Sequence, residues 1–246
     1  SDPPRRLNIT LYGANDETYR KLCNNPKGFT QVINNIKMLQ EKNIDIKLNC
    51  SLTTLNIHEQ EKMYKIAENL GLPIEMGYYM FPPTRKNNIN NVSYRLSPSQ
   101  AAMARFTYER LKRDESQMLE YVNYALNTYE SYKQTEAYTT GYTCRSGNSV
   151  FWVNYDGTMS ACSFTNDYQI NIFENGFVYS WNKLIKHVSN SKLSEKCHYC
   201  KERILCGRCA AAAYAETGDI NGVPEYYCKL TNHYIELLKE YKEKHK

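Results

Sequence analysis

The segment Lys196–Cys209, KCHYCKERILCGRC, places four cysteines within fourteen residues. They form two Cys-x-x-Cys pairs, Cys197/Cys200 and Cys206/Cys209. Such a pair lets two thiolates bind one metal centre from a single tight turn, and two adjacent pairs are strong evidence of metal. The C-terminal part of the chain is therefore expected to depend on metal for its fold.

Three further cysteines, Cys144, Cys162 and Cys228, accompany these pairs. The sequence shows neither a membrane-spanning apolar run nor a signal peptide, so we expect a cytoplasmic protein that does not contact a membrane. Thiols are kept reduced in that compartment, which favours metal binding over disulfides. A zinc site would take four ligands and leave three of the seven cysteines without a role.

The segment 151–162, FWVNYDGTMSAC, separates two of these cysteines. It predicts a hairpin with a two-residue type I′ turn at Asp156-Gly157. Such a hairpin folds Cys162 back beside Phe151, so the preceding loop 144–149, CRSGNS, can bring Cys144 near it. Two ligands of one site are thus expected to meet there.

The first ninety or so residues alternate between strand and helix patterns. Apolar residues alternate with polar ones at 7–12 and 44–53, which predicts two strands, and a third is expected at 74–80. Apolar residues at helical spacing predict helices after Phe29 and over 63–70, the latter ended by Gly71. This order predicts an α/β fold with parallel strands covered by helices.

Both clear strands carry Asn, Thr, Ser and Lys on the face opposite to the apolar one. If the apolar faces meet the helices, the polar faces line a cavity; an edge strand or a solvated face explains them equally well for either strand alone. Residues 82–96 are polar and predict a linker. Ser97, Pro98 and Gln100 predict a capping box that starts helices over about 98–113 and 115–135.

The formal charge of +5 and the twenty-two tyrosines do not predict a nucleic-acid surface, because the lysines are spread along helices. A solvated surface is the favoured interpretation. Cys50 and Cys23 are expected to be core thiols. His198 is expected to be a loop residue that donates a hydrogen bond.

The full cysteine pattern resembles a known family. The pattern is similar to the seven-cysteine SPASM domain of radical S-adenosylmethionine (radical SAM) enzymes. It consists of Cys144, twelve residues, Gly157, four residues and Cys162, followed by the two Cys-x-x-Cys pairs and Cys228. ITLYGANDETYRKLC, LNCSLTTLN and YRLSPSQ resemble the later half of the partial barrel in peptide-modifying members. The resemblance covers nearly all 246 residues.

The resemblance implies the later half of a partial (β/α)6 TIM-like barrel in 1–96, a helical connection in 97–142 and an α+β iron–sulfur SPASM domain in 143–246. It implies two auxiliary 4Fe–4S clusters. Cys197, Cys200, Cys206 and Cys228 would hold one, and Cys144, Cys162 and Cys209 the other. It also implies that Thr10, Tyr12, Asn49 and Ser51 approach S-adenosylmethionine.

The sequence departs from the family pattern at three places. The last cysteine pair has two intervening residues where three are commonest, and EAYTTGYT stands where a further ligand cysteine is expected before Cys144. The second departure predicts an open iron site. The triplet Cys-x3-Cys-x2-Cys, which binds the initiating third 4Fe–4S cluster, does not occur, so the sequence is expected to be a fragment or to have lost initiation chemistry.

The resemblance therefore predicts part of an enzyme that modifies a ribosomally made precursor peptide, with flavodoxin or ferredoxin as external electron donor. An open iron favours a thioether cross-link; carbon–carbon cross-linking and sulfatase-maturase-like oxidation remain alternatives. A non-enzymatic zinc-stabilised binding domain is the alternative from a different functional class.

Overall fold

The computed structural model describes residues 4–82, 94–132 and 141–245, and these divide into two compact units. The first unit contains the described residues within 1–80, 89–122 and 236–246, and the second those within 81–88 and 123–235. The division after residues 96 and 142 stays a prediction. Most of the predicted linker lies outside the described residues. So does the part of the predicted boundary near 137–143 that ends at residue 140.

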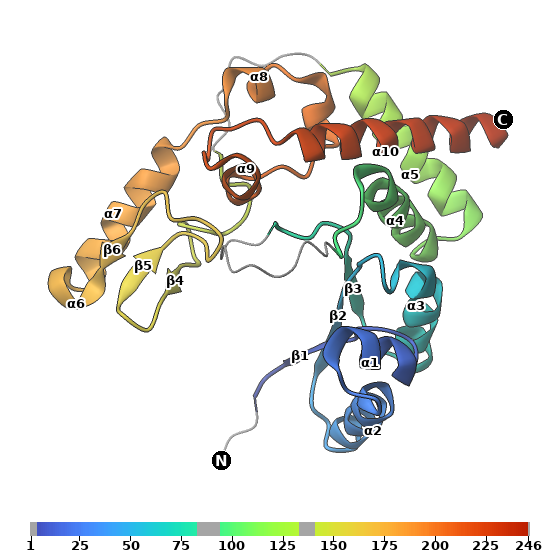
Figure 1. The fold of residues 1–246 in the computed structure, drawn as a ribbon. Coiled ribbons are helices and arrows are strands. Elements are labelled where there is room, and N and C mark those ends of the chain that lie inside the picture. The colour runs from blue at the N-terminus through green and yellow to red at the C-terminus, as the bar shows by residue number, and fades with distance from the viewer. Residues whose placement is uncertain (1–3, 83–93, 133–140, 246) are drawn as a thin grey trace. The chain divides into compact units, whose positions relative to one another are not determined.

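The first unit contains a parallel sheet in the order β1-β2-β3 (Figure 1). Helices connect its consecutive strands, so the sheet consists of strand–helix–strand units, and the predicted α/β arrangement is confirmed. All three strands are shorter than predicted. The elements are β1 (Leu7–Thr10), α1 (Asp16–Cys23), α2 (Gly28–Glu41), β2 (Ile46–Ser51), η1 (Ile57–Glu59), α3 (Gln60–Asn69) and β3 (Ile74–Gly77).

Helices α2 and α3 cover the apolar face of this sheet. Ile46 and Leu48 of β2 pack with Ile36 of α2 and Ala67 of α3, and all four are essentially inaccessible to solvent. Alternation along β2 then turns the intervening residues to the opposite face. The prediction that the apolar strand faces meet the helices is therefore confirmed.

The predicted start and stop signals of the helices also appear in the structure. Gly71 follows α3 with a positive φ of 66°, a conformation that glycine adopts without steric cost. Ser97 caps α4 (Pro98–Leu111) through the reciprocal capping box with Gln100. Helix α5 (Glu115–Glu130) follows, and both α5 and α10 (Glu225–Lys244) contribute residues to the two units.

Two buried polar side chains fasten the carboxyl ends of β1 and β2. Asn56, fully buried, donates from Nδ2 to the carbonyl oxygens of Tyr12 and Ser51 at 3.0 and 3.1 Å. The carboxylate of Glu59 accepts from the backbone N–H of Ala14 at 2.8 Å, from the hydroxyl of Thr18 at 2.9 Å and from the amide of Asn15. These bonds fix the loop that follows β1.

The Glu59→Gln substitution is expected to lower the free energy of unfolding by about 1–3 kcal/mol, because either orientation of the new amide turns a donor toward a buried donor. Denaturant unfolding measures the change. Glu61→Gln is the matched control, since Glu61 is exposed on the adjacent helix α3. Equal stability of the two variants would show that Glu59 does not fasten this loop.

The second unit contains a small antiparallel sheet, in the order β4-β5-β6, and several helices (Figure 1). Within residues 4–82, 94–132 and 141–245, no helix combines the length and apolarity needed to cross a membrane. The elements are β4 (Trp152–Val153), β5 (Thr158–Ser160), β6 (Ile170–Asn171), α6 (Ile172–Asn175), α7 (Phe177–Asn190), α8 (Glu195–His198), η2 (Lys201–Ile204), α9 (Ala210–Thr217) and α10.

The β4–β5 hairpin is present, but its predicted two-residue turn is wrong. The pairs Trp152↔Ser160 and Val153↔Met159 leave five residues, 154–158, between the innermost paired positions. Gly157 has a positive φ of 81°, whereas Asp156 does not have a positive φ. The Asp156 carboxylate accepts from the N–H of Thr158 at 2.9 Å, and this bond holds the pKa of the carboxyl below its usual value. Such a bond favours a local turn that needs positive φ only at the glycine.

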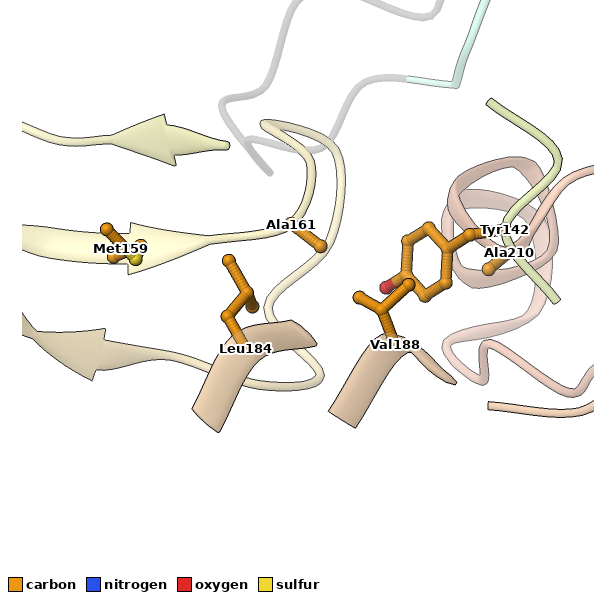
Figure 2. Close-up of a cluster of buried hydrophobic side chains, with 6 residues drawn as sticks. All are labelled: Tyr142, Met159, Ala161, Leu184, Val188 and Ala210. Atoms are coloured by element: carbon orange, nitrogen blue, oxygen red, sulfur yellow. The ribbon is translucent and has the colours of Figure 1, made fainter. Parts of the chain in front are cut away.

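A buried apolar cluster, which we call the Tyr142 core, joins the sheet to the helices of the second unit (Figure 2). Leu184 and Val188 of α7 pack with side chains from β5, from the segment before the hairpin and from the start of α9. Burial of these side chains provides the main driving force for this part of the fold. Its members are Tyr142, Met159, Ala161, Leu184, Val188 and Ala210.

Candidate metal centre

Three cysteines, Cys144, Cys162 and Cys209, adjoin the Tyr142 core in sequence; we call them the three-cysteine set. Cys162 follows Ala161, Cys209 precedes Ala210, and Cys144 lies two residues after Tyr142. The N–H of Ala210 donates to the carbonyl of Gly141 at 2.7 Å, which ties two of these segments together. Packing of the core therefore determines where the three thiols lie.

The three thiols are close enough to interact electrostatically. Burial has the largest influence on the pKa of Cys162 and raises it. A hydrogen bond from the backbone of Phe164 lowers this pKa, and the nearby thiols of Cys209 and Cys144 raise it. The sulfur of Cys209 accepts from the N–H of Ala212 at 3.4 Å at the start of α9. Cys144 is exposed and its sulfur donates to the hydroxyl of Ser146 at 3.1 Å.

The other four cysteines of the C-terminal pattern line one cavity of about 490 Å³ in the second unit. Short helices and one long helix supply them. We call this space the four-cysteine cavity; its cysteines are Cys197 in α8, Cys200 before η2, Cys206 after η2 and Cys228 in α10. A cavity of this volume has room for a group much larger than one ion, because a water molecule occupies only about 30 Å³ of the liquid.

Burial favours the protonated form of two thiols of this cavity, Cys200 and Cys228. Burial, and then the neighbouring Glu202 carboxylate, raises the pKa of Cys200 to about 12, and its sulfur donates to Glu202 at 2.9 Å. Burial also raises the pKa of Cys228, followed by the nearby thiols of Cys206 and Cys197. Metal binding here must displace these protons, so affinity would rise with pH.

Among the described residues, no group of three or more His, Cys, Asp or Glu side chains is arranged so that it could hold a metal ion. The thiols instead surround a space. Thiolates are the ligands of iron–sulfur groups, and the four-cysteine cavity offers four of them around a volume of that scale. The residues present therefore fit a polynuclear iron–sulfur group.

The four residues predicted near S-adenosylmethionine lie at the carboxyl ends of β1 and β2. Thr10 is opposite Asn49 in the parallel register, and both are partly accessible on the polar face. Ser51 is exposed at the end of β2, and Tyr12 is 41% exposed two residues after β1. The structure brings these residues to one edge of the sheet.

The remaining thiols and the histidine differ in burial. Cys50 is 2% exposed and lies 3.5 Å from the sulfur of Met63, as expected of a core thiol, and burial raises its pKa to about 12. The core assignment of Cys23 is wrong, because this residue is exposed at the end of α1. His198 is buried within the short helix α8, where its ring contacts Tyr199.

The sequence reasoning missed two buried donors beside the cysteines, Arg208 and Thr231, both of which line the four-cysteine cavity. Position within the motif could have indicated both. Arg208 lies between Cys206 and Cys209, and Thr231 lies three residues after Cys228, which is one turn along the same helix. Asn56 and Glu59 were also missed.

The chain is similar in sequence to two enzymes named AdoMet-dependent heme synthase. It is 25% identical to the protein of Methanosarcina barkeri over 233 residues and 21% identical to that of Nitratidesulfovibrio vulgaris over 236 residues. Each match covers 87% of this chain but only 65% and 62% of the relatives, respectively. No protein-family model matches the chain.

The fold is similar to solved structures of anSMEcpe. The structure with bound AdoMet and Kp18Cys peptide matches 97% of this chain and 69% of that one, with a TM-score of 0.62 and 18% identity. The structure with bound AdoMet alone matches with a TM-score of 0.59 and 18% identity, over 97% of this chain and 68% of that one. Together, these similarities support the resemblance to radical SAM proteins of the SPASM type that the cysteine pattern indicates.

The match extends over both units, because 97% of the chain is aligned with the anSMEcpe structure. The cysteine-rich second unit therefore belongs to the shared fold along with the parallel sheet. This chain and the anSMEcpe structures share a mixed α/β fold.

Proposed function

We propose that the chain is part of a radical SAM enzyme that modifies a ribosomally made peptide, with two auxiliary 4Fe–4S clusters in its second unit. The observation that carries the proposal is the separation of seven cysteines into the four-cysteine cavity and the three-cysteine set. One zinc site would engage only four of them. The solved neighbour with a bound peptide supports a peptide substrate.

In this proposal, Cys197, Cys200, Cys206 and Cys228 ligate one cluster, and Cys144, Cys162 and Cys209 ligate the other. When bound, the clusters supply one-electron transfer, with flavodoxin or ferredoxin as the external donor. The chain's own residues hold the clusters and restrict their exposure. The cysteines of the four-cysteine cavity are partly buried, whereas Cys144 is exposed and leaves one side of the three-cysteine set accessible.

That accessible side leads us to propose thioether formation as the reaction. Three cysteines leave one coordination position for a substrate cysteine, whose sulfur would be held as a thiolate beside the set. Thr10, Tyr12, Asn49 and Ser51 would orient S-adenosylmethionine at the end of the parallel sheet. They could do so by directed hydrogen bonds from the polar face.

A second candidate is AdoMet-dependent heme synthesis, favoured by the names of the two sequence relatives. In that case, the accessible side of the three-cysteine set would face a heme precursor instead of a peptide. The two candidates share the clusters and differ in the ligand.

The test is anaerobic reconstitution of the chain with iron and sulfide, followed by titration with a synthetic cysteine-containing peptide. We expect a brown protein with about eight iron and eight sulfide per chain, as two 4Fe–4S clusters require. The peptide is expected to change the electron paramagnetic resonance (EPR) spectrum of the cluster held by the three-cysteine set. The same peptide with serine in place of cysteine is the matched control.

Colourless protein with stoichiometric zinc would refute the iron–sulfur assignment. An EPR spectrum that responds to an iron porphyrin but not to the cysteine peptide would replace the peptide proposal with the heme candidate. Equal responses to the cysteine and serine peptides would exclude binding through the substrate thiolate.

A further inference from the structure

Arg208 is the buried cation at the four-cysteine cavity. Only 6% of the residue is exposed, and its Nη2 donates to the carbonyl oxygens of Ile220 and Gly222 at 2.6 and 3.3 Å. Its Nε and Nη1 are buried and have no hydrogen-bond partner among the described residues. An unpaired buried donor of a charged group is costly, so these two N–H groups indicate that an acceptor is bound in the cavity.

The surroundings of Arg208 show which kind of acceptor this is. Burial lowers the pKa of the Arg208 guanidinium, and the nearby thiols of Cys197, Cys209 and Cys206, followed by the carboxylate of Asp219, act to raise it. Cys197 and Cys206 line the cavity, whereas Cys209 belongs to the three-cysteine set. Sulfur atoms from both groups of cysteines therefore lie near the Arg208 guanidinium.

Thr231 supplies a second donor to the same cavity. The residue is fully buried in α10, and its Oγ1 has no hydrogen-bond partner among the described residues. It lines the cavity one helical turn after Cys228. Two unrelated segments thus present unpaired donors to a space enclosed by four thiols.

We propose that Arg208 and Thr231 are positioning residues that donate hydrogen bonds to the sulfur atoms of the iron–sulfur group held in the four-cysteine cavity. The inference rests on the proposed function. Nη2 anchors Arg208 to the loop before α10, and Nε and Nη1 face the sulfur. Hydrogen bonds to sulfur and nearby positive charge stabilise the more negative reduced state, so the two residues raise the reduction potential of this group.

The test measures the midpoint potential of the reconstituted chain by EPR-monitored redox titration. The Cys206→Ala variant identifies the EPR signal of the iron–sulfur group in the four-cysteine cavity, because the spectrum of this variant lacks that signal. Arg208→Gln is expected to retain iron and to shift this potential to a more negative value. Arg208→Lys, which retains the charge but not the planar set of donors, is expected to give a smaller shift.

Arg203→Gln is the matched control for charge. Arg203 also lines the cavity, but it is only partly buried and its Nη2 donates to the hydroxyl of Tyr132 at 3.3 Å. Equal shifts of the midpoint potential in Arg208→Gln and Arg203→Gln would overturn the hydrogen-bonding role, because loss of charge alone would then explain both shifts. An unchanged potential in Arg208→Gln would overturn the proposal entirely.

Thr231→Val keeps the test decisive if Arg208→Gln fails to fold, because valine has nearly the same shape as threonine. The iron-free variant is expected to be at least as stable as the parent chain, since the removed hydroxyl is buried without a partner there. The iron-loaded variant is expected to unfold at a lower temperature than the loaded parent. Equal melting temperatures of the two loaded chains contradict the proposal, whereas a parent that binds no iron instead refutes the proposed function.

Discussion

Replacing Cys206 with alanine is expected to remove about four of the eight iron atoms and to lower the unfolding temperature of the loaded chain. Cys206 lines the four-cysteine cavity, and its thiol interacts with Cys228 of α10. Metal binding supplies folding energy to small metal-dependent units, so loss of one ligand loosens the segment that joins η2 to α10. Iron analysis and thermal unfolding under anaerobic conditions measure both effects.

The Cys23→Ala variant is the matched control, because Cys23 is an exposed thiol in the first unit. It should retain the full iron content and the parent unfolding temperature. If Cys206→Ala retained the same iron content and melting curve as Cys23→Ala, Cys206 would not be a ligand.

The Leu184→Ala substitution is expected to lower the free energy of unfolding by about 2–5 kcal/mol. Leu184 is fully buried in the Tyr142 core, where removal of its side chain leaves a cavity between α7 and the small sheet (Figure 2). Denaturant unfolding of the iron-free chain measures this loss without the contribution of metal. The loaded variant is also expected to lose iron preferentially from the three-cysteine set.

Val178→Ala tests the same helix at a solvent-exposed position. Val178 is 70% exposed near the start of α7, so its truncation is expected to change stability by less than about 0.5 kcal/mol. A small effect of Leu184→Ala, similar to that of Val178→Ala, would show that the Tyr142 core does not stabilise this unit.

Elements with a strong local pattern were predictable from the sequence. Alternation of apolar and polar residues predicted β1 and β2, and helical spacing predicted α2 and α3. Gly71 and the Ser97 capping box marked helix ends because both signals act within a few residues. The division of the seven cysteines came from resemblance, since spacing alone could not say which thiols share a site.

Features that depend on distant partners could not be predicted. Glu59 accepts from residues more than forty positions away, and its neighbours in sequence do not indicate this. The hairpin turn was mispredicted because the hydrogen bond from the backbone N–H of Thr158 to the Asp156 carboxylate competes with the two-residue form. Arg208 was missed because its role depends on burial, which a polar residue in a cysteine-rich loop does not suggest.

The adjacency of the three-cysteine set to the Tyr142 core limits how this region can change. Ala161 precedes Cys162 in the chain, and Ala210 follows Cys209. A larger side chain at either alanine therefore displaces a thiol as well as the packing neighbours of the alanine. Core volume and ligand geometry therefore cannot vary independently. A designer who grafts this site into another scaffold must transfer α7 and the small sheet together with the cysteine loops.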